Sequence, residues 1–86
     1  MSELIDINDV VVAAGELLRE FEALSDTPMV VRERDALRGA YNELVTCVED
    51  EIEVPQEDLQ WISDIIAFGL WEVGYYRLVA AEVVSE

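Results

Sequence analysis

The chain has 86 residues, enough for one domain spanning 1–86, and 52% of them are hydrophobic, which is too many for a disordered acidic segment. Twenty Asp and Glu residues against five Arg, with no Lys or His, give a net charge of −15. This balance disfavours direct binding to nucleic acid or to an anionic membrane surface, and it favours a basic protein as partner.

The first predicted element is a helix over residues 7–24. Asp6 is a suitable N-cap for it. Apolar residues follow at alternating spacings of three and four, which is typical of one face of a helix: Ile7, Val10, Ala14, Leu17, Phe21 and Leu24.

The second predicted element is a helix over residues 28–50. Thr27 is a good N-cap, and Pro28 suits the first helical position. Arg34 falls on the apolar stripe of this helix, so we expect it to snorkel from the edge or to pair with a carboxylate. The short connection at 25–27 predicts an antiparallel hairpin with the first helix.

The third predicted element is a helix over residues 56–84, after the break at Pro55. It is apolar on two sides. One stripe comprises Leu59, Ile62, Ile66, Gly69, Val73, Tyr76, Ala80 and Val83, and the opposite one comprises Trp61, Ile65, Phe68, Trp71, Tyr75 and Val79. A helix that is apolar nearly all round is covered on most sides, so it lies at the centre of the fold or meets another molecule.

An alternative exists for the end of this segment. Gly69 and Gly74 could interrupt the helix, and the composition of residues 75–79 also fits a short strand pair. With the continuous helix, the sequence predicts an all-α fold. This is a small three-helix bundle, with a four-helix bundle as the variant, in which an antiparallel hairpin packs on a long apolar C-terminal helix.

The charge is unevenly distributed along the chain. Between Gly39 and Tyr76 there are nine acidic residues and no basic one. Six acids fall within ten residues, and we take them as the first candidates for partner binding: Glu49, Asp50, Glu51, Glu53, Glu57 and Asp58. A solvated acidic loop is the alternative interpretation.

Two further sets of residues are candidates for the same role. A second acidic row, on the outer side of the first helix, comprises Asp9, Glu16 and Glu20. Neighbouring carboxylates on such a row lie about 5–6 Å apart, comparable to successive phosphates of a nucleic acid. Trp61 and Trp71 are candidate interface anchors if they are exposed, because aromatic residues are enriched in interfaces.

The sequence offers no motif for catalysis, metal or cofactor binding. The absence of His and the presence of one cysteine, Cys47, exclude zinc sites, Cys–His nucleophiles and serine triads. We therefore expect no enzyme and no cofactor. A single cysteine fits a reducing compartment, and charges interrupt the most apolar stretch, 62–84, so we expect a cytoplasmic protein that does not span a membrane.

One enzymatic interpretation comes from a resemblance. Glu16, Glu20, Glu57 and Asp64 loosely resemble the magnesium-binding carboxylates of small helical nucleotide pyrophosphohydrolases of the MazG type. The resemblance covers about thirty residues, and it would imply a carboxylate-bound magnesium ion. The paired Glu-x-x-Glu and Glu-x-x-Asp spacings of that family are missing, since Glu20 follows Glu16 by four residues and Asp64 follows Glu57 by seven.

In size, charge and helical pattern the chain resembles small acidic phage-encoded inhibitors of host defence, such as anti-CRISPR and DNA-mimic proteins. The resemblance implies an inhibitor whose carboxylates occupy a groove lined by Lys and Arg, on a basic partner that binds nucleic acid. It rests on no residue motif, so it transfers no functional residue.

Three alternatives explain the same features. An immunity protein or antitoxin that neutralises a basic toxin would also be small and acidic. A structural or virion component could form a homodimer or larger assembly through its C-terminal helix. The acidity could also reflect adaptation to a high-salt cytoplasm, which predicts that folding requires molar salt.

Overall fold

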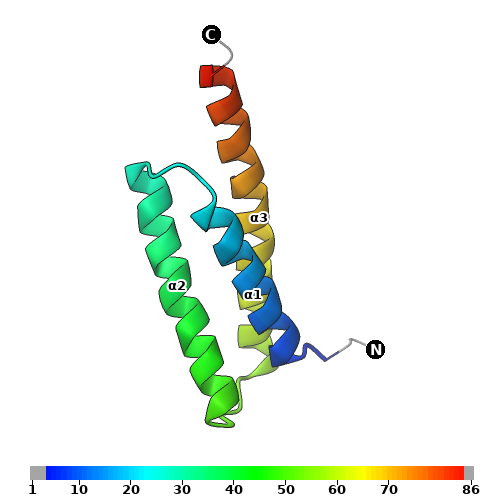
Figure 1. Ribbon diagram of the computed structural model, residues 1–86. Helices are drawn as coiled ribbons and strands as arrows, with labels where there is room; N and C mark the ends of the chain where they lie inside the picture. The colour runs from blue at the N-terminus through cyan, green and yellow to red at the C-terminus, as the bar shows by residue number, and fades with distance from the viewer. Residues whose placement is uncertain (1–3, 85–86) are drawn as a thin grey trace.

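The computed structural model is a bundle of three helices, and it describes residues 4–84, with side chains described for residues 4–80 (Figure 1). Helix α1 spans Ile7–Glu22, α2 spans Pro28–Glu49 and α3 spans Gln56–Val84. These bounds fall within two residues of the predicted ones, a difference no larger than the fraying of helix ends. The predicted all-α fold is confirmed.

The alternative of a strand pair near the end of the third segment is wrong. Helix α3 continues through Gly69 and Gly74, and residues 4–84 contain no strand. The side chains of residues 81–84, among them Val83 of the predicted stripe, lie outside the described ones. Strand propensity in residues 75–79 is overridden because the apolar stripe keeps its helical spacing through this region.

The predicted N-caps of the first two helices are present. A side-chain oxygen of Asp6 accepts a hydrogen bond from the Asn8 backbone N–H at 2.9 Å. Thr27 Oγ1 accepts one from the Val30 backbone N–H at 3.3 Å, and Pro28 occupies the first turn of α2. Each cap satisfies a backbone donor that has no partner within its helix.

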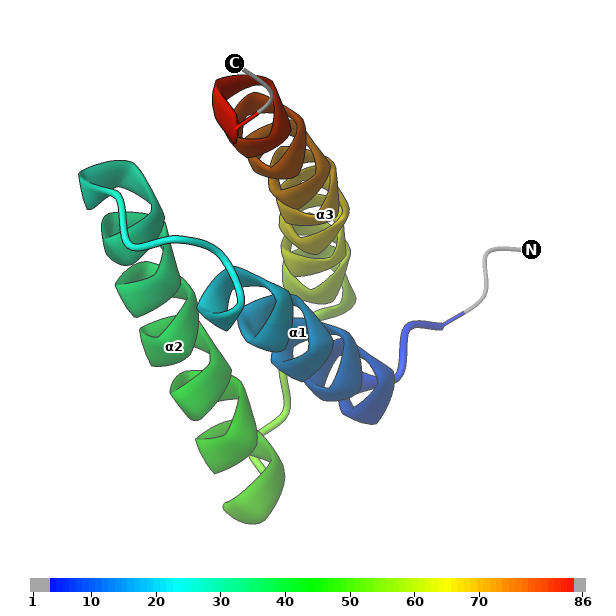
Figure 2. The same cartoon turned by 45° about the horizontal axis from the view of Figure 1, so that its top comes forward.

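Helix α1 is the central element, and α2 and α3 lie on two different sides of it. Figures 1 and 2 show α2 antiparallel to α1, with α3 running in the same general direction as α1 and extending past the hairpin. Both α2 and α3 pack against α1, whereas among the described residues the backbones of α2 and α3 stay apart and meet only through side chains, as in the Tyr76–Glu33 hydrogen bond at 3.1 Å. We predicted that the third helix either lies at the centre of the fold or meets another molecule. The central position is wrong, because α1 occupies it.

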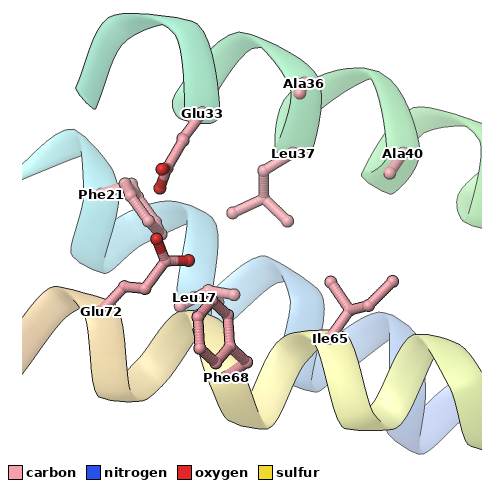
Figure 3. Close-up of a pocket in the computed structure, with 10 residues that line it drawn as sticks. Leu17, Phe21, Glu33, Ala36, Leu37, Ala40, Ile65, Phe68 and Glu72 are labelled. Atoms are coloured by element: carbon pink, nitrogen blue, oxygen red, sulfur yellow. The ribbon is translucent and has the colours of Figure 1, made fainter. Parts of the chain in front are cut away.

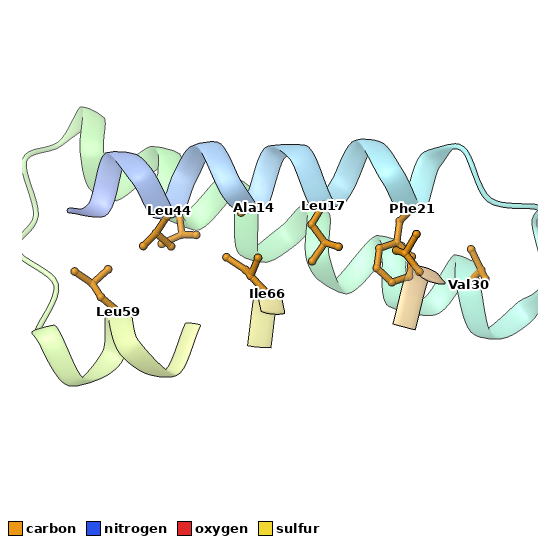
Figure 4. Close-up of a cluster of buried hydrophobic side chains, with 9 residues drawn as sticks. Ala14, Leu17, Phe21, Val30, Leu44, Leu59 and Ile66 are labelled. Atoms are coloured by element: carbon orange, nitrogen blue, oxygen red, sulfur yellow. The ribbon is translucent and has the colours of Figure 1, made fainter. Parts of the chain in front are cut away.

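The core is one cluster in which α1 supplies the largest share (Figure 4). Leu17 is the most completely enclosed large side chain, and it lies directly over Gly69 of α3. A Cβ at Gly69 would stand 2.6 Å from Leu17 Cδ2, so α1 and α3 can approach this closely only because residue 69 has no side chain. The buried members are Val10, Ala14, Leu17, Phe21, Val30, Leu44, Leu59, Ile66 and Val73.

Arg34 fastens α2 to the end of α1. Its guanidinium donates hydrogen bonds to the Phe21 carbonyl at 3.0 and 3.2 Å and to the Leu24 carbonyl at 3.1 Å. It also pairs with Asp26 at 2.8 Å. The predicted carboxylate pairing is confirmed, and the guanidinium in addition binds two backbone carbonyls at the end of α1, one of which, that of Phe21, also accepts the Leu24 N–H.

Candidate partner-binding surfaces

The turn between α2 and α3 has a defined geometry. Glu51 adopts a left-handed backbone conformation, with φ of 55°. The Ile52 N–H donates to the Cys47 carbonyl at 2.8 Å, and the Glu51 N–H donates to the Val48 carbonyl at 3.3 Å. This is the hydrogen-bond pattern of a Schellman cap, in which glycine usually occupies the left-handed position. The turn thus holds several carboxylates on a fixed backbone.

All six residues of the predicted acidic run are exposed, and they gather where α2 ends and α3 begins. The N-terminal segment braces this end of the molecule, because Gln56 and the Ile5 backbone exchange two hydrogen bonds at 2.7 and 2.9 Å. The three ion pairs within residues 4–80 involve other acids. We call Glu49, Asp50, Glu51, Glu53, Glu57 and Asp58 the acidic end.

The second predicted row, on α1, is less uniform. Asp9 and Glu16 are exposed, as predicted for the outer side of the helix. Glu20 is half-buried and pairs with Arg77 of α3, near the opposite end of the molecule from the α2–α3 turn. The structure therefore brings the members of the acidic end together, and it places Glu20 in a different surface.

A groove runs between α2 and α3, and two buried residues of α1 lie beneath part of it. Figure 3 shows the part of the groove beside the first half of α2, which we call its upper part. It is a hollow of about 250 Å³ with Leu17 and Phe21 at its floor. Ile65 and Phe68 line it from α3. The lining from α2 comprises Glu33, Ala36, Leu37 and Ala40.

A second hollow, of about 410 Å³, continues the groove toward the acidic end. Ala40 lines both hollows, so they form one surface along α2. Trp61 and Asp58 line the second hollow from α3, which places a member of the acidic end beside an aromatic side chain. We call the two hollows together the α2–α3 groove.

The outward stripe of α3 is rich in large aromatic residues. Trp61 is 66% exposed, Phe68 59% and Trp71 64%, so both predicted anchors are at the surface. Trp71 stacks on Phe68 at a ring separation of 5.7 Å and on Tyr75 at 5.9 Å. Exposed aromatic surface of this extent is typical of a protein–protein interface.

Two carboxylates face each other over the upper part of the groove. Figure 3 shows the Glu33 and Glu72 side chains pointing toward each other from α2 and α3. Partial burial raises the pKa of Glu72, and the charge of Glu33 and a side-chain hydrogen bond with it raise it further. Tyr76 donates a hydrogen bond to Glu33 at 3.1 Å. Burial raises the pKa of Tyr76, and this hydrogen bond raises it further.

Sequence reasoning did not select Glu33 or Glu72. A signal was present in the second case, because Glu72 falls at helical spacing on the outward apolar stripe, after Ile65 and Phe68. A carboxylate on an otherwise apolar stripe marks the border of a surface or a site for a cationic group. Glu33 gave no comparable signal, because its position opposite Glu72 depends on how the helices pack.

Within residues 4–80, no three acidic or cysteine side chains converge in a way that would hold a metal ion. The four carboxylates that resemble the MazG type thus do not gather into a magnesium site. No helix in the described part of the chain is both long and apolar enough to cross a membrane.

Comparisons of the chain with protein-family models, with curated proteins and with solved structures give no match.

Proposed function

We propose that this protein is a non-enzymatic inhibitor that binds a basic, nucleic-acid-binding protein by presenting carboxylates where that protein would hold phosphates. The acidic end presents six exposed carboxylates, one of which, Asp58, lines a mostly apolar hollow, and this juxtaposition is the main support for the proposal. Charges alone would give fast but weak association, whereas an adjoining apolar surface with an exposed tryptophan adds affinity.

The division of roles follows from the positions of the residues. The acidic end steers the partner and sets the salt dependence of binding, because its carboxylates are exposed and screened by ions. Trp61 lines the hollow next to Asp58, so it would become desolvated once the partner docks. The backbone of the α2–α3 turn is held by its cap hydrogen bonds, which limits the entropy lost on binding.

The partner belongs to one of two classes that share the same chemistry. A host defence enzyme that handles nucleic acid would make the chain an anti-CRISPR-like or anti-restriction inhibitor. A basic nuclease toxin would make it an immunity protein or antitoxin. Both present Lys and Arg in a nucleic-acid groove, so the identity of the bound protein separates the two.

The test is retention of proteins from lysate of the source cells on the immobilised chain at low and high salt. We expect a basic, nucleic-acid-binding protein to be retained at low salt and released at high salt. Glu49→Lys with Glu53→Lys should abolish retention. Glu22→Lys with Asp64→Lys is the matched control, because it changes the net charge equally at exposed positions outside the acidic end and outside the row on α1.

Equal loss of binding in both variants would show that net charge alone matters, and unchanged binding in the first would rule out the acidic end. Circular dichroism should show the same helicity in all three proteins, since Glu22, Glu49 and Glu53 make no side-chain hydrogen bond or ion pair within residues 4–80 and Asp64 only accepts one from the exposed Gln60 side chain.

A second candidate function is self-association of the chain as a structural component. One observation favours it: Trp71 and Leu78 are exposed on a part of α3 that lines neither hollow of the groove. Sedimentation at several concentrations and salt levels tests it. A dimer that resists salt and is dissociated by Trp71→Lys would support this candidate over the inhibitor.

A further inference from the structure

We propose that the α2–α3 groove binds a basic amphipathic helix of the partner, which seats as the fourth helix of a bundle. The inference rests on the proposed function in one respect, that the partner is a basic protein. It adds the form of the binding element and the residues that receive it.

The arrangement of the helices leaves one position of a four-helix bundle vacant. Helices α2 and α3 each pack on α1, while within the described residues their backbones stay apart and the Glu33 side chain, which accepts from Tyr76, reaches across between them. A helix laid between α2 and α3 would contact both and lie diagonally opposite α1, as in a four-helix bundle. Figure 2 shows the two helices on different sides of α1.

The lining of the groove fits the apolar face of a helix. Leu37, Ile65 and Phe68 offer apolar surface in its upper part, and Trp61 and Ile62 do so in its lower part. Residues at positions i, i+3, i+4 and i+7 of a guest helix would cover this surface, which is how amphipathic helices bind in grooves. The exposed rings of Trp61 and Phe68 would then lose contact with water.

The charges of the groove specify the flanks of that helix. Every charged residue that lines it is acidic: Glu33, Glu43, Asp58 and Glu72. Lys or Arg beside the apolar face of the guest would pair with these carboxylates. A second copy of this chain is disfavoured as occupant, because each copy carries a net charge of −15 and its own groove residues are acidic.

The environment of Glu72 supports a cationic guest. Burial and the neighbouring Glu33 disfavour its ionised form in the free protein, as the raised pKa indicates. A guanidinium or ammonium group placed between the two carboxylates would favour ionisation of both. Glu33 also accepts the Tyr76 hydroxyl, so the rim carboxylate on α2 is held in position before binding.

The probe is a synthetic 18-residue peptide with leucines on one helical face and lysines on its flanks, about 27 Å long when helical. The two tryptophans report where it binds. We expect a blue shift of fluorescence that persists in Trp71→Phe and is lost in Trp61→Phe, because only Trp61 lines the groove. A scrambled peptide of equal composition and charge should bind at least about tenfold more weakly.

Two pairs of variants test the groove itself. Ala40→Phe fills the part common to both hollows and should weaken peptide binding at least about tenfold, whereas Ala67→Phe, at an exposed position of α3 outside the groove, should not. Glu33→Gln with Glu72→Gln should weaken binding more than Glu16→Gln with Glu22→Gln, although both double variants remove two charges.

The outcomes separate this inference from the proposed function. If Ala40→Phe keeps the natural partner with unchanged affinity while Glu49→Lys with Glu53→Lys loses it, the inhibitor proposal stands and the groove is excluded. If neither change affects the partner, both proposals fail. Equal binding of the scrambled peptide would overturn the inference alone, and so would a salt-resistant dimer that excludes the peptide but persists in Trp71→Lys.

Discussion

The side of α3 that faces α1 and the side that faces the α2–α3 groove are made of similar residues in different surroundings. Leu59, Ile66 and Val73 lie on the first side and are buried. On the second side, Trp61 and Phe68 each have more than half of their surface exposed, and Ile65 is 46% exposed. The first side has a partner within the chain, and the second has none among residues 4–80.

The difference shows that an apolar helix face predicts that the face is covered, but it does not identify the element or the molecule that covers it. The first side is covered because Gly69 lets α1 approach to within contact of the α3 backbone. The second side is bordered by carboxylates of two helices, which raises the energy of closing α2 onto α3 without a cation. The same chain therefore builds one finished interface and one open surface.

The largest expected effect compares the two sides directly. Leu17→Ala should lower the free energy of unfolding by about 2–5 kcal/mol, because it leaves a cavity in the tightest part of the core. Phe68→Ala should change it by less than about 0.5 kcal/mol, because most of that side chain is already in water. Urea unfolding followed by circular dichroism measures both. Similar losses in the two variants would contradict the division into a closed and an open side.

The next effect tests the close approach of α1 and α3. Gly69→Ala should lower the free energy of unfolding by about 1–3 kcal/mol, because the added methyl group overlaps with the enclosed Leu17 side chain. Gly74→Ala is the matched control in the same helix. Nothing lies within 4 Å of its added Cβ, so it should stabilise the chain by up to about 1 kcal/mol through helix propensity. Two changes of the same sign would argue against this packing.

Much of the fold was predictable from local pattern. Asp6, Thr27 and Pro28 marked helix starts, and the spacing of Val10, Leu17 and their neighbours gave the buried face of α1, because caps and periodicity depend only on nearby residues. The sequence did not decide whether the third helix is central or peripheral. That depends on which of its two apolar sides meets α1, and both sides have the spacing that a buried face requires.

The candidate site was predictable in its parts and not in its assembly. Local composition identified the acidic end and the two tryptophans, and all of them are exposed. The groove was not foreseen because it lies between helices distant in sequence, where Ala40 and Phe68 become neighbours only through α1. Glu33 and Glu72 meet for the same reason, so no local pattern could pair them.

A smaller effect is expected at the turn that leads into α3. Glu51 holds a left-handed conformation that costs an L-residue about 1–2 kcal/mol and glycine almost nothing. Glu51→Gly should therefore stabilise the chain, by somewhat less than that cost because glycine also gains freedom in the unfolded state. The midpoint of urea unfolding measures it. A loss of stability in Glu51→Gly would refute the strain at this position. If the variant is more stable but binds the partner more weakly, the Glu51 carboxylate serves binding at a cost in stability.

The smallest effect concerns Glu72, on the border between the two sides of α3. Its pKa is raised in the folded state, so between its unfolded and folded pKa values the folded chain binds the proton more tightly. Stability contributed by the protonated carboxyl is present at acidic pH and is lost as pH rises through the folded pKa. Glu72→Gln should therefore flatten the fall in unfolding free energy above the ordinary glutamate pKa, measured by urea unfolding from acid to neutral pH. Asp64→Asn is the control, since that side chain is exposed and lies outside the groove. An equal flattening in both variants would show that net charge, rather than the pairing of Glu72 with Glu33 across the open groove, sets the slope.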